Sequence, residues 1–448
     1  MGETMENKAT VRAAFIAVTT LFFAWGFITS LNDPLVAAVK GIFTLTNVQA
    51  QLSAFAFFIA YGVVSFPAAA LIARIKPVPA ILVAIAMMAL ACLVMLGAAN
   101  EAHYTLVLVG LFIMASGITI LQVAANPLAA ALGDPRGSHF RLTLSQTFNS
   151  FGTFIGPILG SFLFLKGVEV KEGVALTPAI RADALAGIDR AYFWICGLLV
   201  LLLAFFWFSR STVADAAPRP APGRGMGGLV AEAIASKWAL FGGLAIFLYV
   251  GAEVAIGTQM ALFLNANAIW GQSDIAFTVP FLSHVMASDG VTGVSLQEAG
   301  KAVAFYWGGA MVGRAVGSAL LARLEAPRLL AFFTAVACAM CLYVFAFGGV
   351  SSGFVALGIG VFNSIMFPVI FTITLDRSSA SEEATSGLLC TAIVGGAFLP
   401  LLVGEVADRA GYVAAFLVPA ACYLVLCVFA ISAGRVLPKR DVEALVTH

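Results

Sequence analysis

Long apolar runs separated by short polar stretches dominate the hydropathy pattern of the chain. Reading these runs between charged residues, glycine and proline gives about twelve segments. Each is long enough for the roughly 20 residues with which a helix crosses a bilayer. We therefore predict an all-α membrane protein with twelve transmembrane helices. The segments are 11–38, 48–74, 79–98, 104–132, 139–165, 190–209, 235–264, 296–323, 327–347, 351–375, 384–406 and 412–434.

Composition supports this prediction and excludes soluble classes of protein. Hydrophobic residues make up 61% of the chain and charged residues 10%, against roughly 45–50% and 25% in a soluble domain. The mean hydropathy of +1.00 leaves too little polar surface for a water-soluble particle. A soluble enzyme and a single-pass receptor with a polar ectodomain are both excluded. With a net charge of +1 and no basic tract, nothing in the sequence indicates nucleic acid as a partner.

Lysine and arginine predict how the chain is oriented, because they gather in cytoplasmic connections. Placing both termini in the cytoplasm puts most of them on the inner side. Residues 211–228 are rich in Pro, Gly and Ala and indicate a flexible linker between spans six and seven. The expected domains are residues 1–210 and 233–448, each a six-helix bundle, joined by a cytoplasmic linker at 211–232. We expect a multi-pass membrane protein that acts as a monomer.

The two halves of the chain repeat each other weakly. Several short matches recur at nearly one offset, which favours an internal duplication and two pseudo-symmetric bundles. Many secondary transporters are built this way, with a midplane site between the repeats. Gly152, Gly156 and Gly160 recur every four residues, a spacing that lets helices approach closely. The matching features are 70–74 with 319–323, Pro157 with Pro400, and Asn126 and Pro127 with Asn363 and Pro368.

One acidic residue, Asp33, lies in the outer half of the first span. Ionisable side chains within a membrane are costly and are therefore functional candidates. Asp33 follows Asn32 and precedes Pro34, which loosens the helix by removing a backbone donor. We interpret Asp33 as an ion carrier. The alternative is an aspartate at a helix end that meets interfacial water.

Two pairs of amide side chains share helix faces in spans four and five. Gln122 and Asn126 are four residues apart, and Gln146 and Asn149 are three apart, so each pair lies on one face. Amides offer both donors and acceptors, which suits the hydroxyl groups of a sugar. A polyol-lined cavity is one interpretation, and hydrogen bonding between helices without a ligand is the other.

The second half of the chain carries a further set of polar and aromatic residues. Glu253 in span seven lies too deep for a solvated side chain. Three interpretations stay open: a titrating group, a sugar ligand, or half of a buried pair with Arg314 of span eight. Trp307, beside Tyr306, is either a stacking platform for a sugar or part of the core. Gln259 of span seven and Asn363 of span ten add amides to the candidate substrate-binding residues.

Enzymatic chemistry is not indicated. The four histidines show no metal-ligand spacing, and there is no GxxxxGK[ST] loop for ATP. We therefore expect neither an enzyme nor a protein with a cofactor or a bound metal.

Four motifs resemble the fucose permease family of the major facilitator superfamily, in particular its glucose/galactose and N-acetylglucosamine branch. The resemblance implies two six-helix bundles, alternating access and cation-coupled sugar import through the inner membrane of a bacterium. It also implies that Asp33 couples a proton and that Asn149 binds sugar. Fucose permease has a glutamate at the position of Gln122 and an amide at that of Glu253. The motifs are residues 22–33, 121–127, 146–152 and 306–314.

Together these features predict an importer of a monosaccharide, of the glucose/galactose or N-acetylglucosamine class, driven by proton symport across the lipid bilayer. Asp33 and Glu253 are the candidate coupling groups, and Asn32 lies beside the expected sugar site. A sodium ion is the alternative coupling ion, with Asp33, Asn32 and Gln122 as its oxygen ligands. A drug or metabolite exporter shares the architecture. A sugar-sensing membrane receptor would require a cytoplasmic output domain. A polytopic membrane enzyme would require a reactive cluster of side chains at the membrane interface.

Overall fold

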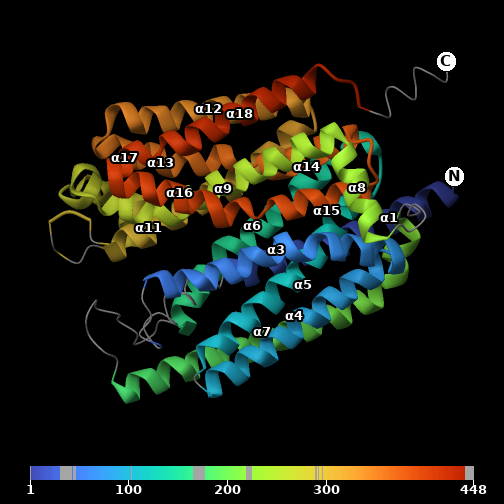
Figure 1. The fold of residues 1–448 in the computed structure, drawn as a ribbon, viewed down its shortest axis with the longest axis horizontal. Helices are drawn as coiled ribbons and strands as arrows, with labels where there is room; N and C mark the ends of the chain where they lie inside the picture. The colour runs from blue at the N-terminus through green and yellow to red at the C-terminus, as the bar shows by residue number, and fades with distance from the viewer. Residues whose placement is uncertain are drawn as a thin grey trace. The chain divides into compact units, whose positions relative to one another are not determined.

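The structure, a computed structural model, describes residues 2–30, 43, 47–101, 103–164, 177–217, 225–287, 290, 292–294 and 296–438. The described elements are helical (Figure 1). Ten of the helical stretches in this described part are long and apolar enough to cross a membrane. An all-α membrane protein is thus confirmed. The total of twelve spans stays a prediction.

The long helices of the first half overlap the predicted segments. The predicted spans 139–165 and 190–209 correspond to α6 and α7, and a short 3-10 turn, η1, precedes α6. The elements are α1 (Gly2–Ser30), α3 (Asn47–Ile75), α4 (Pro77–Asn100), α5 (Tyr104–Ala131), η1 (Pro135–Gly137), α6 (Ser138–Phe164), α7 (Pro178–Ala216) and α8 (Met226–Ala235).

The second half contains more helical elements than predicted spans, because three of its spans are interrupted and because η2, η3 and α10 lie in the connection between spans seven and eight. The elements are α9 (Lys237–Asn265), η2 (Asn267–Gly271), η3 (Ile275–Thr278), α10 (Pro280–Met286), α11 (Leu296–Leu321), α12 (Ala326–Phe347), α13 (Gly349–Asn363), α14 (Met366–Arg377), α15 (Glu382–Ala392), α16 (Gly395–Ala410), α17 (Tyr412–Ala415) and α18 (Leu417–Gly434).

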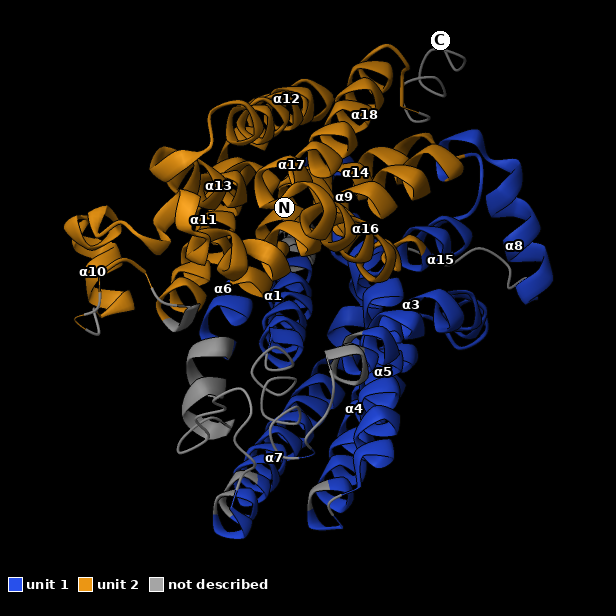
Figure 2. Cartoon of the chain, turned by 60° about the vertical axis from the view of Figure 1, so that its left-hand side comes forward, with its two compact units in different colours: residues 1–138, 151–239, 379–391 blue, residues 139–150, 240–378, 392–448 orange. Residues whose placement is uncertain are grey.

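The chain divides into two compact units whose membership crosses the sequence halves (Figure 2). Unit 1 comprises residues 1–138, 151–239 and 379–391, and unit 2 comprises 139–150, 240–378 and 392–448. In unit 1, α4 packs against α5 and α7, and α3 packs against α5; in unit 2, α12 packs against α13 and α18. The beginning of α6 therefore belongs with helices from the second half, and α15 belongs with helices from the first.

Proline and glycine set several of the helix boundaries. Pro77 begins α4 and Pro327 lies in the first turn of α12, where a missing N–H is not needed. Gly348 and Gly349 separate α12 from α13 with φ angles of 57° and 69°. Gly411, with φ 88°, separates α16 from α17. These left-handed conformations favour glycine, so the sequence itself limits the lengths of these helices.

Small residues allow α6 to lie close to α1 within unit 1. A β-carbon at Gly152 would collide with the backbone of Phe23 and Phe27, and one at Gly156 would collide with Ser30. The predicted role of the repeated glycines in close helix packing is confirmed at these two positions.

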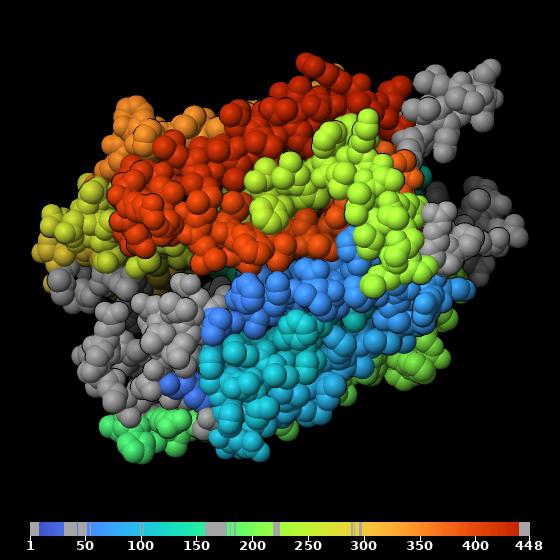
Figure 3. Space-filling view, viewed as in Figure 1, coloured from blue at the N-terminus to red at the C-terminus, as the bar shows by residue number. Residues whose placement is uncertain are grey.

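Two expectations about the end of the first half were wrong. Helix α7 runs from Pro178 to Ala216, well beyond the predicted 190–209 at both ends. The expected flexible linker at 211–228 is helical at both edges, because α7 includes 211–216 and α8 begins at Met226. Helix α8 packs against α3, and Figure 3 shows the two side by side on the molecular surface. The Glu232 carboxylate of α8 also accepts hydrogen bonds from the backbone N–H and hydroxyl of Ser381.

Candidate functional site

A buried ion pair joins α9 and α11 within unit 2. Nη2 of Arg314 lies 3.7 Å from Oε1 of Glu253, and both residues are less than a tenth exposed. Of the three interpretations of Glu253, the paired one matches this geometry. Two opposite charges at this depth compensate each other, and removal of either leaves a buried charge without its partner.

Arg314 also bonds to the backbone and side chains of other helices. Its Nε donates to the carbonyl of Ser364 at 2.7 Å. Its Nη1 donates to the hydroxyl of Ser150 and, at 3.5 Å, to the carbonyl of Gln146, both on α6. The guanidinium thus ties α11 to α6, α9 and the junction of α13 with α14.

The Ser364 carbonyl is open to Arg314 because of Pro368. In a continuous helix the N–H of residue 368 would bond to the carbonyl of residue 364, and proline has no N–H. The chain breaks here, so that α13 ends at Asn363 and α14 begins at Met366. The predicted segment 351–375 corresponds to the membrane span Gly349–Arg377, and the break inside it was not predicted. The proline supplies an acceptor for the arginine.

A tyrosine and an asparagine extend the polar cluster around Glu253. The hydroxyl of Tyr306 donates to the backbone carbonyl of Glu253 at 3.1 Å, and Nδ2 of Asn363 donates to that hydroxyl at 2.7 Å. Oε1 of Glu253 faces Arg314, and the Tyr249 hydroxyl interacts with the Glu253 side chain. Among the described residues, Oδ1 of Asn363 is buried without a hydrogen-bond partner. Buried polar atoms are nearly always paired in proteins, so this oxygen is suited to a polar ligand or to water.

Unit 1 contains the amides of α5. Gln122 is buried, and its Nε2 donates to the hydroxyl of Tyr61 on α3 at 2.9 Å. Asn126, one turn further along α5, is fully buried. The hydroxyl of Ser386 donates to the carbonyl of Val123 at 3.0 Å. In a helix the N–H of residue 127 would donate to that carbonyl, but Pro127 has no N–H. The arrangement therefore parallels that of Pro368 and Ser364 in unit 2.

The other predicted residues of unit 2 lie on α6, α9 and α11. Gln146 is buried and Asn149 is half-buried. Trp307 is half-buried, its ring lies at 74° to that of Tyr306 with centroids 5.1 Å apart, and its indole covers Gly257 on α9. Gln259 is half-buried and its side chain faces Gly404 of α16. Asn32 and Asp33 lie outside the described residues, which resume after α1 only at residue 43.

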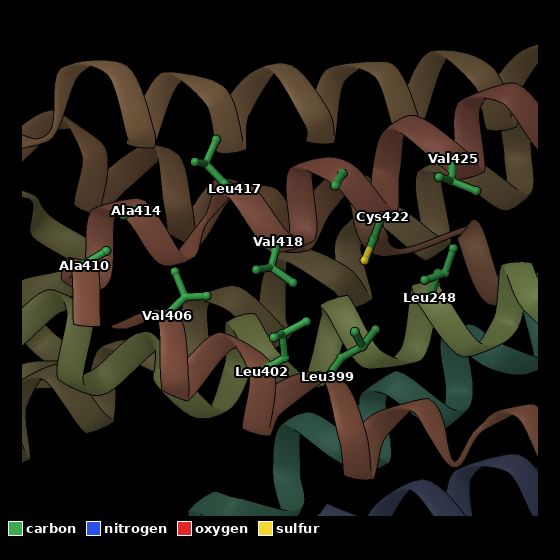
Figure 4. Close-up of a pocket in the computed structure, with 11 residues that line it drawn as sticks. Leu248, Leu399, Leu402, Val406, Ala410, Ala414, Leu417, Val418, Cys422 and Val425 are labelled. Atoms are coloured by element: carbon green, nitrogen blue, oxygen red, sulfur yellow. The ribbon is translucent and has the colours of Figure 1, made fainter. Parts of the chain in front are cut away.

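An apolar groove of about 600 Å³ lies elsewhere in unit 2, along α9, α16, α17 and α18 (Figure 4). Its lining comprises aliphatic side chains, such as Leu402 and Val418, and the thiol of Cys422. This surface suits hydrocarbon and lacks the hydrogen-bonding groups that a sugar needs. The polar residues described above for each unit are therefore the better candidates for sugar ligands.

Comparison with known proteins identifies the family. Residues 14–391 match the family model of the Major Facilitator Superfamily. The chain belongs to this superfamily. It is 37% identical to a glucose/galactose transporter of Brucella abortus, with 94% of each chain covered. It is 29% identical to the L-fucose-proton symporter of Escherichia coli, covering 93% of this chain and 92% of that one.

A solved structure supports the same assignment within the superfamily. The crystal structure of the E. coli fucose:proton symporter matches with a TM-score of 0.78 and 26% identity, covering 94% of this chain and 98% of that one. The resemblance to the fucose permease family that the sequence motifs indicate is thus confirmed. This major facilitator chain is a multi-pass membrane transporter.

Several residues of the polar clusters were absent from the predicted site. Tyr61, Ser150 and Ser364 are partners of Gln122 or Arg314. For Ser364 a sequence signal exists, because a proline inside a span exposes the carbonyl four residues earlier. Arg314 was considered only as a partner of Glu253. For Tyr61 and Ser150 the sequence holds no comparable signal, since serine and tyrosine are common in membrane helices.

Proposed function

We propose that this major facilitator protein imports a monosaccharide of the glucose/galactose or N-acetylglucosamine class by proton symport with alternating access. The proposal places twelve spans in a bacterial inner membrane, with both termini in the cytoplasm. Residues 1–210 and 233–448 form the two halves, and the protein acts as a monomer. Similarity over 94% of the chain to a glucose/galactose transporter supports the sugar class.

The observation that carries the proposal is the buried cluster around Glu253. It combines a compensated charge pair with Oδ1 of Asn363, which has no hydrogen-bond partner among the described residues. A sugar is uncharged and rich in hydroxyl groups, so it satisfies such an acceptor without adding charge. The half-buried Trp307 offers a flat surface for the apolar face of a sugar ring.

The amides are proposed as the remaining sugar ligands. Each amide side chain can donate to one hydroxyl and accept from another. Asn363 and Gln122 are already oriented by hydrogen bonds from their amide nitrogens to Tyr306 and Tyr61. Their carbonyl oxygens therefore act as the acceptors for sugar hydroxyls. The proposed substrate-binding residues are Asn32, Gln122, Asn126, Gln146, Asn149, Glu253, Gln259, Trp307 and Asn363.

Coupling requires a group whose charge changes as sugar is carried. We assign the proton to Asp33, with Glu253 as a second candidate. Proton binding and sugar binding both shift the equilibrium between the outward-open and inward-open states. This shared equilibrium couples the two fluxes. One charge is worth about 2.3 kcal/mol per 100 mV of membrane potential, enough for well over tenfold accumulation. The L-fucose-proton symporter among the relatives supports a proton. Sodium, held by Asp33, Asn32 and Gln122, is the alternative.

Uptake into proteoliposomes tests the function. Purified protein is reconstituted, and uptake of labelled glucose, galactose and N-acetylglucosamine is measured with an imposed pH gradient and then with an imposed sodium gradient. We expect accumulation above equilibrium with the pH gradient alone. Accumulation with sodium alone would assign sodium instead. Expulsion of sugar from loaded vesicles against its gradient would support an exporter.

A further inference from the structure

Helix α15 begins span eleven of the sequence, yet it lies in unit 1 among helices of the first half (Figure 2). A β-carbon at Gly387 would stand 3.0 Å from the side chain of Ala69 on α3, so α15 and α3 are in close contact. The hydroxyl of Ser386 also donates to the carbonyl of Val123 on α5 at 3.0 Å. Helix α15 is thus seated on two helices of the other half of the sequence.

The connecting helix α8 holds the start of α15 at two further points. Both oxygens of the Glu232 carboxylate accept from Ser381, one from its backbone N–H at 2.9 Å and one from its hydroxyl at 3.2 Å. The hydroxyl of Ser236 accepts from the backbone N–H of Ser379 at 3.1 Å. Glu232 and Ser236 are four residues apart and therefore share one face. This face meets the non-helical stretch that connects α14 to α15.

The bond from Ser381 to Glu232 is compatible with the capping of α15. The hydroxyl oxygen of Ser381 accepts from the backbone N–H of Ala384 at 3.4 Å, and its one hydrogen is donated to Glu232. The first turn of α15 also contains Glu382 and Glu383, whose negative charges offset any attraction of a third carboxylate to the helix dipole. The hydrogen bonds, rather than net charge, therefore hold Glu232 to Ser381.

The chain changes unit at both ends of α15. Helix α14 belongs to unit 2, residues 379–391 belong to unit 1, and α16 belongs to unit 2 again. Span eleven is broken at the second of these boundaries, because α15 ends at Ala392 and α16 begins at Gly395. The N–H of Gly396 bonds to the carbonyl of Ile393, three residues back instead of four. A tight turn thus separates α15 from α16.

The equivalent span of the first half is not broken in this way. Helix α6 runs from Ser138 to Phe164 without interruption, although the boundary between the units falls after residue 150. Its start lies with helices of the second half, where Nε2 of His139 is 3.4 Å from Oδ2 of Asp376 on α14. Of these two helices, α15 is the one whose span is jointed at the boundary. It can therefore turn about the break at 393–394 while α6 moves as one piece.

We propose that α15 is a hinged gate segment and that α8 is its latch, with Glu232 and Ser236 as the latching side chains. This inference rests on the proposed alternating access. In the proposed topology, α8 and the start of α15 lie on the cytoplasmic side. A path for sugar between the two halves of the sequence opens on that side when α15 leaves the helices of the first half. The latch therefore favours the state that is closed to the cytoplasm, and its release opens that state.

Two native cysteines allow the release of α15 to be measured. Cys390 lies on α15, is fully buried and interacts with the side chain of Ser386. Cys341 is equally buried but lies on α12 in unit 2. A membrane-impermeant sulfonated maleimide is added to inverted membrane vesicles, which expose the cytoplasmic side. Labelling of each cysteine is followed over time by peptide mass spectrometry, so that Cys390 reports release of α15 and Cys341 reports general unfolding.

Removal of the Glu232 carboxylate is the main test. We expect Glu232→Ala to raise the labelling rate of Cys390 about three- to tenfold, because two hydrogen bonds that hold α15 are lost. The labelling rate of Cys341 should not change. Alanine is a strong helix former, so α8 itself persists. Glu232→Gln still presents an amide oxygen to the Ser381 N–H, and its labelling rate should lie between those of wild type and Glu232→Ala.

Glu325→Ala is the matched control. Glu325 precedes another helix on the proposed cytoplasmic side, α12, but its side chain is 65% exposed and pairs with Arg328 three residues later. Its removal should leave the labelling of both cysteines as in wild type. In right-side-out vesicles the reagent meets only the outer side, and we expect no acceleration at Cys390 in Glu232→Ala there.

The outcomes that contradict the latch are distinct from failure of the proposed function. Equal labelling of Cys390 in wild type and Glu232→Ala would overturn the latch. Equal acceleration at Cys341 would make Glu232 a support of the fold alone, and acceleration from the outer side would refute a cytoplasmic gate. The labelling requires neither sugar nor coupling ion. If the expected pattern is found but none of the three sugars is taken up, the proposed substrate is wrong and the latch stands.

Discussion

Removing the charge of Arg314 tests the central electrostatic feature of unit 2. Arg314→Gln leaves the carboxylate of Glu253 buried, with its ion-pair partner at 3.7 Å gone. It also removes the bonds to Ser364, Ser150 and Gln146. Breaking a buried pair from one side costs about 3–5 kcal/mol. We expect Arg314→Gln to lower the free energy of unfolding by an amount in this range.

The reverse substitution and the double variant separate the pair from the hydrogen bonds. In Glu253→Gln, Arg314 keeps its three hydrogen-bond partners on α6 and at the junction of α13 with α14. The free energy of unfolding should therefore fall less than in Arg314→Gln. The double variant Glu253→Gln/Arg314→Gln contains no buried charge. It should therefore be more stable than Arg314→Gln alone, with a coupling energy of about 1–3 kcal/mol between the two positions.

The assay is denaturant unfolding in detergent, followed by tryptophan fluorescence, on all four members of the cycle. Arg409→Gln is the matched control. Arg409 also pairs with a glutamate, Glu405, but its side chain is 79% exposed. An exposed pair contributes at most about 1 kcal/mol. If the effects of Arg314→Gln and Glu253→Gln simply add in the double variant, the two charges do not interact and the description of the site is wrong.

Four further predictions concern transport and packing. Asp33→Asn should abolish uphill sugar uptake and retain exchange down a gradient, measured in proteoliposomes; normal accumulation would refute its coupling role. Trp307→Ala should raise the KM for sugar about tenfold or more through lost ring stacking, whereas an unchanged KM would make Trp307 a core residue. Gly152→Leu should cost about 1–3 kcal/mol of stability by collision with α1, and unaltered unfolding would contradict the close approach. Ser386→Ala should cost about 1 kcal/mol by leaving the Val123 carbonyl unpaired, and no change would show that the carbonyl finds another partner.

The sequence predicts helix positions well where composition and helix breakers agree. The predicted segment 104–132 corresponds to α5 at Tyr104–Ala131, and 327–347 corresponds to α12 at Ala326–Phe347. Hydropathy fails at the start of α7, because Pro178 to Ile188 is a mixed polar and apolar stretch that is nevertheless helical. The prediction also fails at α8, a short apolar helix whose glycines suggested a linker. At α7 the helix extends beyond the apolar run on which the prediction was based, and at α8 the helix includes the glycines on which the predicted linker was based.

The candidate site could be predicted as a set of residues but not as a set of contacts. Burial of Gln122, Glu253 and Asn363 follows from their places in apolar segments. The pairing of Glu253 with Arg314 depends on how far α9 and α11 are turned toward each other, and spacing along one helix does not give that rotation. The contact between His139 and Asp376 could not be predicted for the same reason, because the two residues lie on helices that are far apart in the sequence.

Sugar-dependent proton movement tests the proposed function most directly. Proteoliposomes without any imposed gradient are placed in weakly buffered medium, and glucose or galactose is added outside while the external pH is followed. Proton symport predicts that the medium becomes more alkaline on sugar addition, that a protonophore abolishes the signal, and that L-glucose gives none. Sugar entry with no change in external pH, in the presence or absence of sodium, would contradict the account.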